Sequence, residues 1–515
     1  MPKFNLIDEP WIPSITADGP RQMSLVDVLT EAHNIRELVG DSPPVTIALH
    51  RLLLALLHRI NHGPQDADEW NEIYLAAKFD AEKIRTYFDE FHDRFDLFHE
   101  KYPFYQTPSV REKVKDGAVI KLYFHSGNNA TLFDHTSTTN PKSLSAAEAA
   151  RLVVMIQAFD TGGQITGDDG ADSARAAPLI QTAVALIRGE TLFETLMLNL
   201  HRYCGEDGAP FVFDQDEDRP AWERDGPTIR GSRLPDGPID LLTWQSRRVA
   251  LELEQDENGK PIVRKAVVMA GLSFPEGMEV HTKETMMAFR KNKEGKTYAV
   301  GFSESRDLWR NSLSLLNMAD AFGSRPRMFD WLSQLQRNGF VTQTQLPVDF
   351  CGIAADKAKL LFWSLERFEL PVDYLNDSEV TKDLGTCLEF SEAIGSALRY
   401  GVKMLADKLE TQRESFSTEA NFWSRMEMRF HRLLGDLPEK REAEMVSWFR
   451  DTQRTAKDAL RDTVNGLSGS AAENKAAVAA ENAMHAAINK AVGTKATEWA
   501  KYLPERFEAK GGGSQ

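Results

Sequence analysis

Cysteine is scarce in this chain, because its 515 residues contain only Cys204, Cys351 and Cys387, and none of them belongs to a CxxC pair. A disulfide framework and a cysteine-built zinc knuckle are therefore excluded, and such sparse cysteine is typical of a reducing compartment. Long apolar runs are also missing. The most apolar stretch, residues 47–57, is shorter than the roughly 18–20 residues that span a bilayer. The N-terminus lacks the apolar core of a signal peptide, so we expect a cytoplasmic protein that does not enter a membrane.

An excess of positive charge is absent as well. The chain carries 61 Lys and Arg against 77 Asp and Glu, a formal net charge of −16. This balance disfavours a nucleic-acid-binding protein that works by bulk electrostatics. The charge is uneven, however, because residues 61–100 are strongly acidic whereas residues 219–310 contain several basic clusters. The arginine pair Arg247 and Arg248 is a candidate for phosphate contacts, and Trp244 beside it is a candidate for stacking on a base.

The signatures of common nucleotide-dependent and hydrolytic enzymes are missing, since the sequence has no GxxxxGK[ST], HExxH or GxSxG motif. His58 and His62 stand four residues apart on a predicted helix, which is metal-ligand spacing without an evident third ligand. Asp168, Asp169 and Asp172 form an acidic turn. We expect both groups to be solvated or hydrogen-bonded, so no metal and no cofactor are predicted.

Two polar stretches are candidates for function. Residues 125–142, HSGNNATLFDHTSTTNPK, show no sustained periodicity and predict a long loop, and such loops are often functional. A metal-dependent nuclease or phosphoesterase that uses His125, Asp134 and His135 of this loop stays open as an alternative. Residues 161–172, TGGQITGDDGAD, predict a second irregular segment, because glycine permits backbone shapes that other residues rarely adopt.

The periodicity of the first 377 residues predicts a mixed α/β domain. Apolar residues at three- and four-residue steps predict a helix over residues 45–60. Ser145 and Glu148 form a capping box at the start of a second helix that runs to about residue 159. The runs TAVALIRG and TLFETLMLNLH predict a strand and a helix, residues 205–300 look rich in strands, and residues 4–7 predict a short strand.

Residues 378–505 predict an antiparallel four-helix bundle, because four long amphipathic patterns follow one another with short connections. The third helix is expected to begin with Asp436 as its N-cap and to stop near residue 465. The fourth opens with the capping-box pair Ser470 and Glu473. The fold class is therefore α+β, a large mixed N-terminal domain followed by the bundle. Residues 506–515, which end in GGGSQ, are expected to be a flexible tail resembling an engineered linker.

Six features together resemble the CasA-type large subunit of the type I-E CRISPR surveillance complex, Cascade. They are the opening FNLIDEPWIP (residues 4–13), YPFYQT (residues 102–107), the TGG stretch at Thr161, LFETLMLNL (residues 192–200), LTWQSRR (residues 242–248) and the terminal bundle. The resemblance runs nearly end to end. The first and fifth segments are specific in combination, whereas the glycine stretch alone would be weak.

The resemblance implies a role in antiviral defence. Such subunits cap one end of a crRNA–protein assembly beside the crRNA 5′ handle, and they bind the other Cascade subunits. They read the protospacer-adjacent motif (PAM) of double-stranded target DNA from the minor groove, help to start strand separation and R-loop formation, and dock the helicase-nuclease. They are not enzymes themselves. A purely structural scaffold subunit is a further alternative.

The resemblance also assigns residues to these roles. The first polar stretch matches a loop that reaches the crRNA end and the PAM, with Leu132, Phe133 and Asp134 at its tip. Gly162 and Gly163 match a PAM-reading loop, although an ordinary helix C-cap is the alternative for Gly162.

Two further assignments concern the β-rich region and a segment nearer the bundle. Arg264 or Lys265 matches a basic finger that enters the minor groove, where a cation meets negative potential. The segment of Asp356, Lys357 and Ala358 matches a wedge that intrudes on the first base pair. Some relatives carry a four-cysteine zinc cluster in the β-rich region, but residues 251–262 hold no cysteine, so no zinc is expected here.

Overall fold

In the computed structural model the chain divides into two structural units. Unit 1 comprises Met1–Leu308 and Met318–Arg367, and unit 2 comprises Trp309–Asn317 and Phe368–Gln515. The structure describes residues 4–117, 119–123, 143–168, 170–205, 212–226, 228–276, 278, 283–292, 294–304, 306–316, 323–356, 359–413 and 416–503. Within these ranges, no helix combines the length and the apolar character needed to cross a membrane. The expected tail, residues 506–515, lies outside them. The domain boundary predicted at residue 378 stays a prediction.

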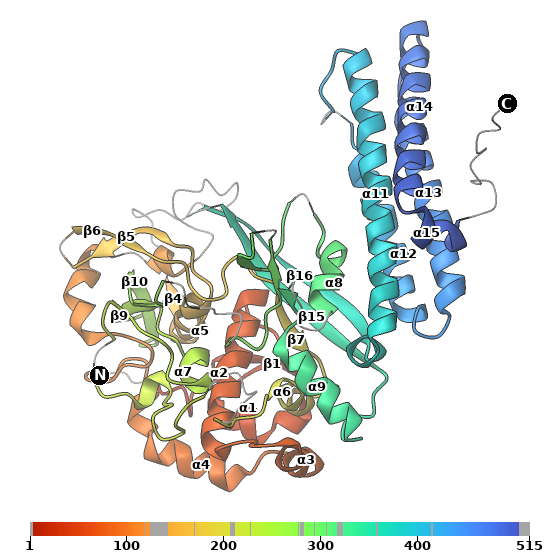
Figure 1. The fold of residues 1–515 in the computed structure, drawn as a ribbon. Coiled ribbons are helices and arrows are strands. Elements are labelled where there is room, and N and C mark those ends of the chain that lie inside the picture. Colours follow the sequence, from red (N-terminus) through yellow and green to blue (C-terminus); the bar gives the residue numbers. More distant parts are fainter. Residues whose placement is uncertain are drawn as a thin grey trace, which may run out of the picture. The chain divides into compact units, whose positions relative to one another are not determined.

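Helix α2 (Pro43–Asn61) confirms the predicted apolar helix of unit 1 (Figure 1). It packs against α5 (Ala146–Ala158), α7 (Pro238–Leu242) and β15 (Gln345–Asp356). Burial extends beyond the predicted apolar stripe and includes His50, Arg51 and His58. Arg51 is tolerated there because its Nη1 lies 3.0 Å from the carboxylate of Glu284, and a buried charge needs such a partner.

The first strand of the N-terminal segment begins further along the chain than the sequence predicts. Strands β1 (Ile12–Thr16), β2 (Gly19–Met23) and β3 (Ile35–Leu38) form one antiparallel sheet in the order β2-β1-β3. The strand predicted over residues 4–7 is wrong. The side chain of Asn5 accepts a hydrogen bond from the amide of Ile7 at 3.0 Å, and the chain turns. A local side-chain acceptor of this kind competes with strand pairing.

A five-stranded sheet contains both hairpins that matter for the candidate site. Its strands are β4 (Leu144–Ser145), β5 (Gly163–Gly167), β6 (Gly170–Ala174), β9 (Arg247–Gln255) and β10 (Pro261–Ala270). Strand β10 pairs with β9, β4 and β5, and β5 pairs with β6 in antiparallel register from Gly163↔Ala174 to Gly167↔Gly170. The glycine-rich stretch is therefore a β-hairpin and not an irregular loop. Glycine has no side chain to reveal strand alternation, which explains the error.

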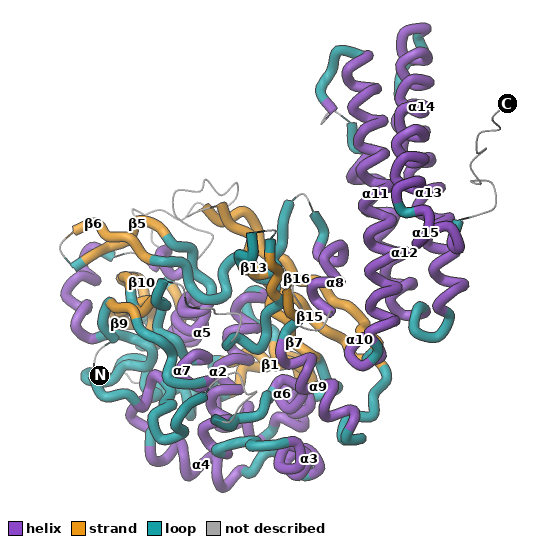
Figure 2. The backbone as a smooth tube through the Cα atoms, viewed as in Figure 1, coloured by secondary structure: helices purple, strands orange, loops and turns teal. Residues whose placement is uncertain are grey.

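Unit 1 contains further sheets and several helices, and Figure 2 shows strands and helices together in this unit. Strands β7 (Val184–Ile187), β15 and β16 (Lys359–Pro371) pair in the order β16-β15-β7. The predicted strand at β7 and the helix α6 (Leu192–Asn199) after it are confirmed. The other described elements are α1 (Leu25–Thr30), α3 (Ala67–Leu75), α4 (Ala81–Glu90), β8 (Gly231–Ser232), β11 (Leu272–Ser273), β12 (Phe289–Lys291), β13 (Thr297–Ala299), β14 (Gly323–Ser324) and α9 (Arg327–Arg337).

Unit 2 contains the predicted four-helix bundle. Its helices are α11 (Ser378–Lys408), α12 (Thr418–Asp436), α13 (Arg441–Asn465) and α14 (Ala471–Thr494), with the shorter α8 (Ser312–Leu316), α10 (Asp373–Asn376) and α15 (Ala496–Trp499) beside them. Small residues let the long helices approach one another. A Cβ atom added to Gly395 of α11 would lie 2.4 Å from the ring of Trp423 on α12. This packing confirms the α+β fold class.

The ends of the bundle helices test the predicted caps. The capping box of Ser470 and Glu473 at the start of α14 is confirmed, with both reciprocal hydrogen bonds formed. The predicted N-cap at Asp436 is wrong, because Asp436 is the last residue of α12 and α13 begins at Arg441. Leu437, buried and still helical in backbone shape, extends the turn after α12, and Lys440 lies 3.2 Å from the carboxylate of Asp436. Tertiary burial therefore overrides the local start signal.

Candidate nucleic-acid interface

Half of the residues that the resemblance assigns to DNA or crRNA lie in described parts of the chain. These are Gly162, Gly163, Arg264, Lys265 and Asp356. Outside the described residues lie Leu132, Phe133, Asp134, Lys357 and Ala358, together with His125 and His135 of the enzyme alternative. The candidate interface consists of the β5–β6 hairpin, the β9–β10 hairpin and the end of β15.

Gly162 and Gly163 lead into the β5–β6 hairpin with a backbone that a side chain would disturb. A Cβ atom added to Gly162 would lie 2.8 Å from the carbonyl oxygen of Ala174 and 2.8 Å from the amide nitrogen of Ala176. Gly163 has a φ of 136°, which residues with a side chain rarely adopt. Helix α5 ends earlier, with Phe159 at its C-cap, so the alternative that Gly162 is a C-cap glycine is wrong.

Arg247 fixes the base of this hairpin. Its side chain is only 1% exposed, and its Nε donates to the carboxylate of Asp160. Its Nη2 donates to the carbonyl oxygen of Thr161 at 3.3 Å. The Gln157 side chain of α5 donates a hydrogen bond of 3.0 Å to the carbonyl oxygen of Arg247 and accepts one of 2.8 Å from the Arg247 amide. The segment before the glycine pair is thus attached to the start of β9.

Arg248 and Lys113 fix the tip of the hairpin. Arg248 is buried, and its Nη1 and Nη2 donate to the two carboxylate oxygens of Asp168 at 3.2 and 2.9 Å. Lys113 donates from its Nζ to the carbonyl oxygen of Gly167 at 2.8 Å. The hydrogen bonds from Arg248 lower the pKa of the Asp168 carboxyl below its ordinary value, and the nearby positive charges of Arg248, Lys113 and Arg230 act in the same direction. Asp168 is therefore ionised at neutral pH.

The two arginines consequently have a different role from the predicted phosphate contacts. Both are buried and bound to carboxylates of the hairpin, so that prediction is wrong. Trp244 is also buried, with the Arg233 guanidinium 4.6 Å from its ring centroid, so a base cannot stack on it in this structure. The charge of these residues was visible in the sequence, but their burial was not. Consecutive arginines instead hold the two ends of the hairpin.

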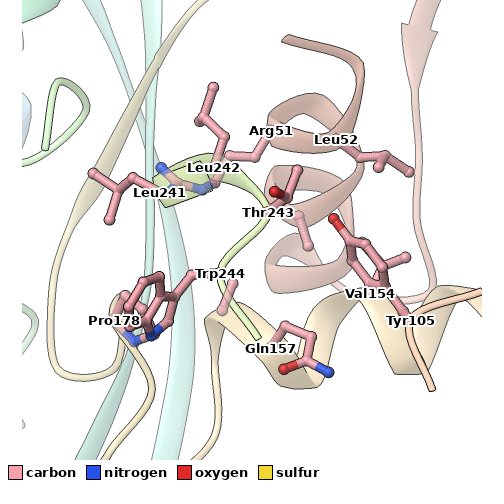
Figure 3. A pocket seen from close by; sticks show the side chains of 12 residues that line it. Arg51, Leu52, Tyr105, Val154, Gln157, Pro178, Leu241, Leu242, Thr243 and Trp244 are labelled. Carbon is pink, nitrogen blue, oxygen red and sulfur yellow. The ribbon is translucent and has the colours of Figure 1, made fainter. Parts of the chain in front are cut away.

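Two of the segments that carry the resemblance meet around one small cavity (Figure 3). Tyr105 comes from the YPFYQT segment, Gln157 from α5, and Thr243 and Trp244 from the LTWQSRR segment. Arg51 of α2 also lines it. The cavity measures about 20 Å³, room for about one water molecule, so it is not a ligand site. These motifs form one packed region that supports the start of β9 and thereby the hairpin.

Arg264 and Lys265 lie on β10, where carboxylates of β9 neutralise them. The Arg264 guanidinium lies 2.5 Å from the carboxylate of Glu254, and the Lys265 ammonium lies 2.9 Å from that of Glu252. A β-bulge separates the pairings of Val263 and Lys265, which leaves Arg264 as the extra residue. All four charged side chains are partly exposed. A phosphate or base edge that binds either cation has to compete with a carboxylate already in place.

Asp356 is the last residue of β15 and is exposed. The chain returns as β16 at Lys359. The preceding main chain is held because Gln181 donates from its side-chain amide to the carbonyl oxygen of Ala355. The expected wedge therefore begins where one of two long paired strands ends, and its two other members lie outside the described residues.

The described residues of the two candidate metal groups contact other partners. His58 is buried, and its Nδ1 lies 3.1 Å from the carbonyl oxygen of Gly63. Asp168 binds Arg248, and Asp172 binds Arg230 at 2.8 Å. No three His, Cys, Asp or Glu side chains gather around a possible metal position in the described ranges.

The structure is thus that of an α+β protein with two structural units. A packed region supports the β5–β6 and β9–β10 hairpins, which carry the charged residues of the candidate interface. The family model of CRISPR-associated protein Cse1 matches residues 5–459 of this chain. The chain belongs to the Cse1 (CasA) family of CRISPR-associated proteins, as its sequence resemblance predicts.

Individual relatives agree with this assignment. The chain is 29% identical over 501 residues to the CasA/Cse1 protein of Thermus thermophilus, an alignment that covers 92% of this chain and 95% of that protein. The crystal structure of Cse1 from Thermobifida fusca is 25% identical with a TM-score of 0.80, covering 96% of this chain and 98% of that one. A chain of a CRISPR RNA-guided surveillance complex is 20% identical with a TM-score of 0.77, covering 94% of this chain and 100% of that one, and shares the fold.

Proposed function

We propose that this chain is the large subunit of a crRNA-guided antiviral surveillance complex and that it recognises the PAM of double-stranded target DNA. Membership of the Cse1 family supports the place in such a complex. The β5–β6 hairpin supports PAM recognition, because two half-buried glycines begin a hairpin whose base and tip are both fixed by arginines. Its partners would be the other complex subunits, the crRNA 5′ handle, the target duplex and a helicase-nuclease.

The physical argument rests on the width of the minor groove. That groove is about 6 Å wide, and it presents the same acceptors for A·T and T·A pairs. Main chain without Cβ atoms approaches base edges there more closely than a residue with a side chain can. Gly163 provides such main chain. Gly162 holds it against β6, because the main chain of Ala174 and Ala176 already fills the space of a Cβ at Gly162. The anchored hairpin spends little conformational entropy when DNA binds.

The other assigned residues complete the proposed role. Arg264 or Lys265 enters the minor groove as a basic finger after exchanging its carboxylate partner for DNA. The segment of Asp356, Lys357 and Ala358 intrudes on the first base pair and helps to start strand separation. The loop around Leu132, Phe133 and Asp134 contacts the crRNA end. These actions need binding alone, so the subunit breaks no covalent bond.

The test is PAM-dependent binding by the complete complex. We would load it with crRNA and measure its affinity for duplexes that differ only in the PAM. Gly163→Asp places a negative side chain at the proposed groove contact, and we expect the preference for the PAM duplex to fall at least tenfold. Gly339→Asp is the matched control, because Gly339 also has positive φ (76°) but faces open space outside the hairpin.

Two results would contradict the proposal. An unchanged PAM preference in the Gly163→Asp complex would show that the hairpin does not read the PAM. A complex that assembles normally but never distinguishes PAM duplexes, even with the native chain, would support the scaffold alternative.

A further inference from the structure

A second polar feature lies beside the β5–β6 hairpin. It is a pocket of about 210 Å³ between the end of β6, the segment at Arg230 and the β9 and β10 strands. The polar side chains among its lining residues are Ser173, Arg175, Arg230, Ser246, Arg247 and Ser273. Guanidinium and hydroxyl groups are donors typical of an anion site. The Ser246 and Ser273 hydroxyls, however, already donate to the carbonyl oxygens of Gln157 at 2.8 Å and of Gly231 at 3.2 Å. The guanidinium groups are therefore the main donors of the pocket.

The three arginines differ in how far they are already neutralised. Arg247 is buried and bound to Asp160, so its charge is balanced. Arg230 is 53% exposed and lies 2.8 Å from the carboxylate of Asp172. Arg175 is exposed, and no described carboxylate forms an ion pair with it. The pocket wall therefore has one positive charge more than the carboxylates that pair with its arginines.

Arg175 is also placed directly against the glycine pair. A Cβ atom added to Gly162 would lie 3.2 Å from the carbonyl carbon of Arg175. The pairing of Gly163 with Ala174 brings the residue before Arg175 into register with the start of β5. The main chain of Arg175, whose side chain lines the pocket, thus lies next to the main chain proposed to enter the minor groove.

We propose that this pocket binds a backbone phosphodiester of the target duplex, with Arg175 as the main contact and Arg230 as the second. The inference rests on the proposed function and extends it. A phosphodiester carries one negative charge and accepts several hydrogen bonds, which matches the single unbalanced cation and the second guanidinium group of Arg230. Phosphates flank the minor groove, and such contacts fix the register of a protein on DNA without reading its sequence.

The test compares Arg175→Gln with the matched variant Arg85→Gln in the assembled complex. Arg85 is an exposed arginine of α4. One lost phosphate contact lowers the slope of log affinity against log salt by about 0.9. When the salt concentration rises from about 50 to 200 mM, the factor by which affinity falls should therefore be about three times smaller for the Arg175→Gln complex than for the native one. PAM and non-PAM duplexes should weaken equally. Arg85→Gln should match the native complex, and an Arg175→Gln complex with the native slope overturns the proposal.

A second arm separates DNA from crRNA as the source of the phosphate. A duplex with an uncharged methylphosphonate at one linkage beside the PAM should bind more weakly to the native complex but not to the Arg175→Gln complex. If the variant instead retains less crRNA per complex and binds DNA normally once loaded, the pocket holds RNA and the proposal is overturned. Loss of PAM preference in the native complex would contradict only the proposed function, because the salt slope reports the phosphate contact independently.

Discussion

Replacing Asp160 by asparagine removes the negative charge opposite Arg247, whose guanidinium has almost no access to water. Losing one partner of a buried ion pair costs about 3–5 kcal/mol, because the other charge stays buried without compensation. The Asp160 side chain is 18% exposed, so water offsets part of the loss. We therefore expect Asp160→Asn to lower the free energy of unfolding of unit 1 by about 3 kcal/mol, the lower end of that range.

The same substitution at the other end of the hairpin is the control. Asp168 is 55% exposed, so water screens its ion pair with the buried Arg248 more strongly than the pair of Asp160 with Arg247. Asp168→Asn should therefore cost less than Asp160→Asn, although both remove one carboxylate that faces an arginine. Urea unfolding of the full chain measures both losses, and hydrogen exchange over residues 160–174 locates them. Because both arginines are buried, equal losses in the two variants would show that exposure of the carboxylate does not decide the energetics of the hairpin.

Three further outcomes are expected. Burial lowers the pKa of His58 to about 4. The contribution of the neutral His58 side chain to the free energy of unfolding is therefore complete above about pH 6.5 and is lost as the pH falls toward 4. The His58→Gln variant should accordingly lose less thermal stability than the native chain between about pH 7.5 and 5. In a urea titration, Gly162→Ala should lower the free energy of unfolding by about 1–3 kcal/mol, because backbone atoms already fill the space of a Cβ. The control Gly435→Ala, which places its Cβ in open space on α12, should not lower it. Incubation with Mg²⁺ or Mn²⁺ and DNA should give no cleavage products; robust cleavage that Asp134→Ala abolishes would favour the nuclease alternative.

The elements predicted correctly are those whose signals are local. Apolar spacing identified α2, and the serine–glutamate pairs at Ser145 and Ser470 identified the starts of α5 and α14, because a cap depends on residues within one helical turn. The strand predicted over residues 4–7 and the N-cap at Asp436 failed for the opposite reason. In the first case a single asparagine side chain turns the backbone, and in the second burial of Leu437 prolongs the turn.

The candidate site was predictable only in part. The resemblance selected Gly162 and Gly163, but composition concealed that they lead into a hairpin, since glycine carries no strand periodicity. Arg247 and Arg248 were visible as cations. Their carboxylate partners, Asp160 and Asp168, also flank the glycine stretch in the sequence, yet nothing local states that the four residues meet. Long-range pairing of this kind is decided by the fold of the five-stranded sheet.

The carboxylates that face Arg264 and Lys265 have a consequence for how the subunit meets random DNA. Glu254 and Glu252 form ion pairs with these cations in the free protein. A DNA phosphate can therefore pair with one of the cations only by displacing its carboxylate partner. The net gain is small for a transient encounter and grows when several contacts form together. If these cations contact DNA as proposed, such an exchange shortens encounters with unrelated duplexes, so a complex built with this subunit can move between many sites before it settles on one.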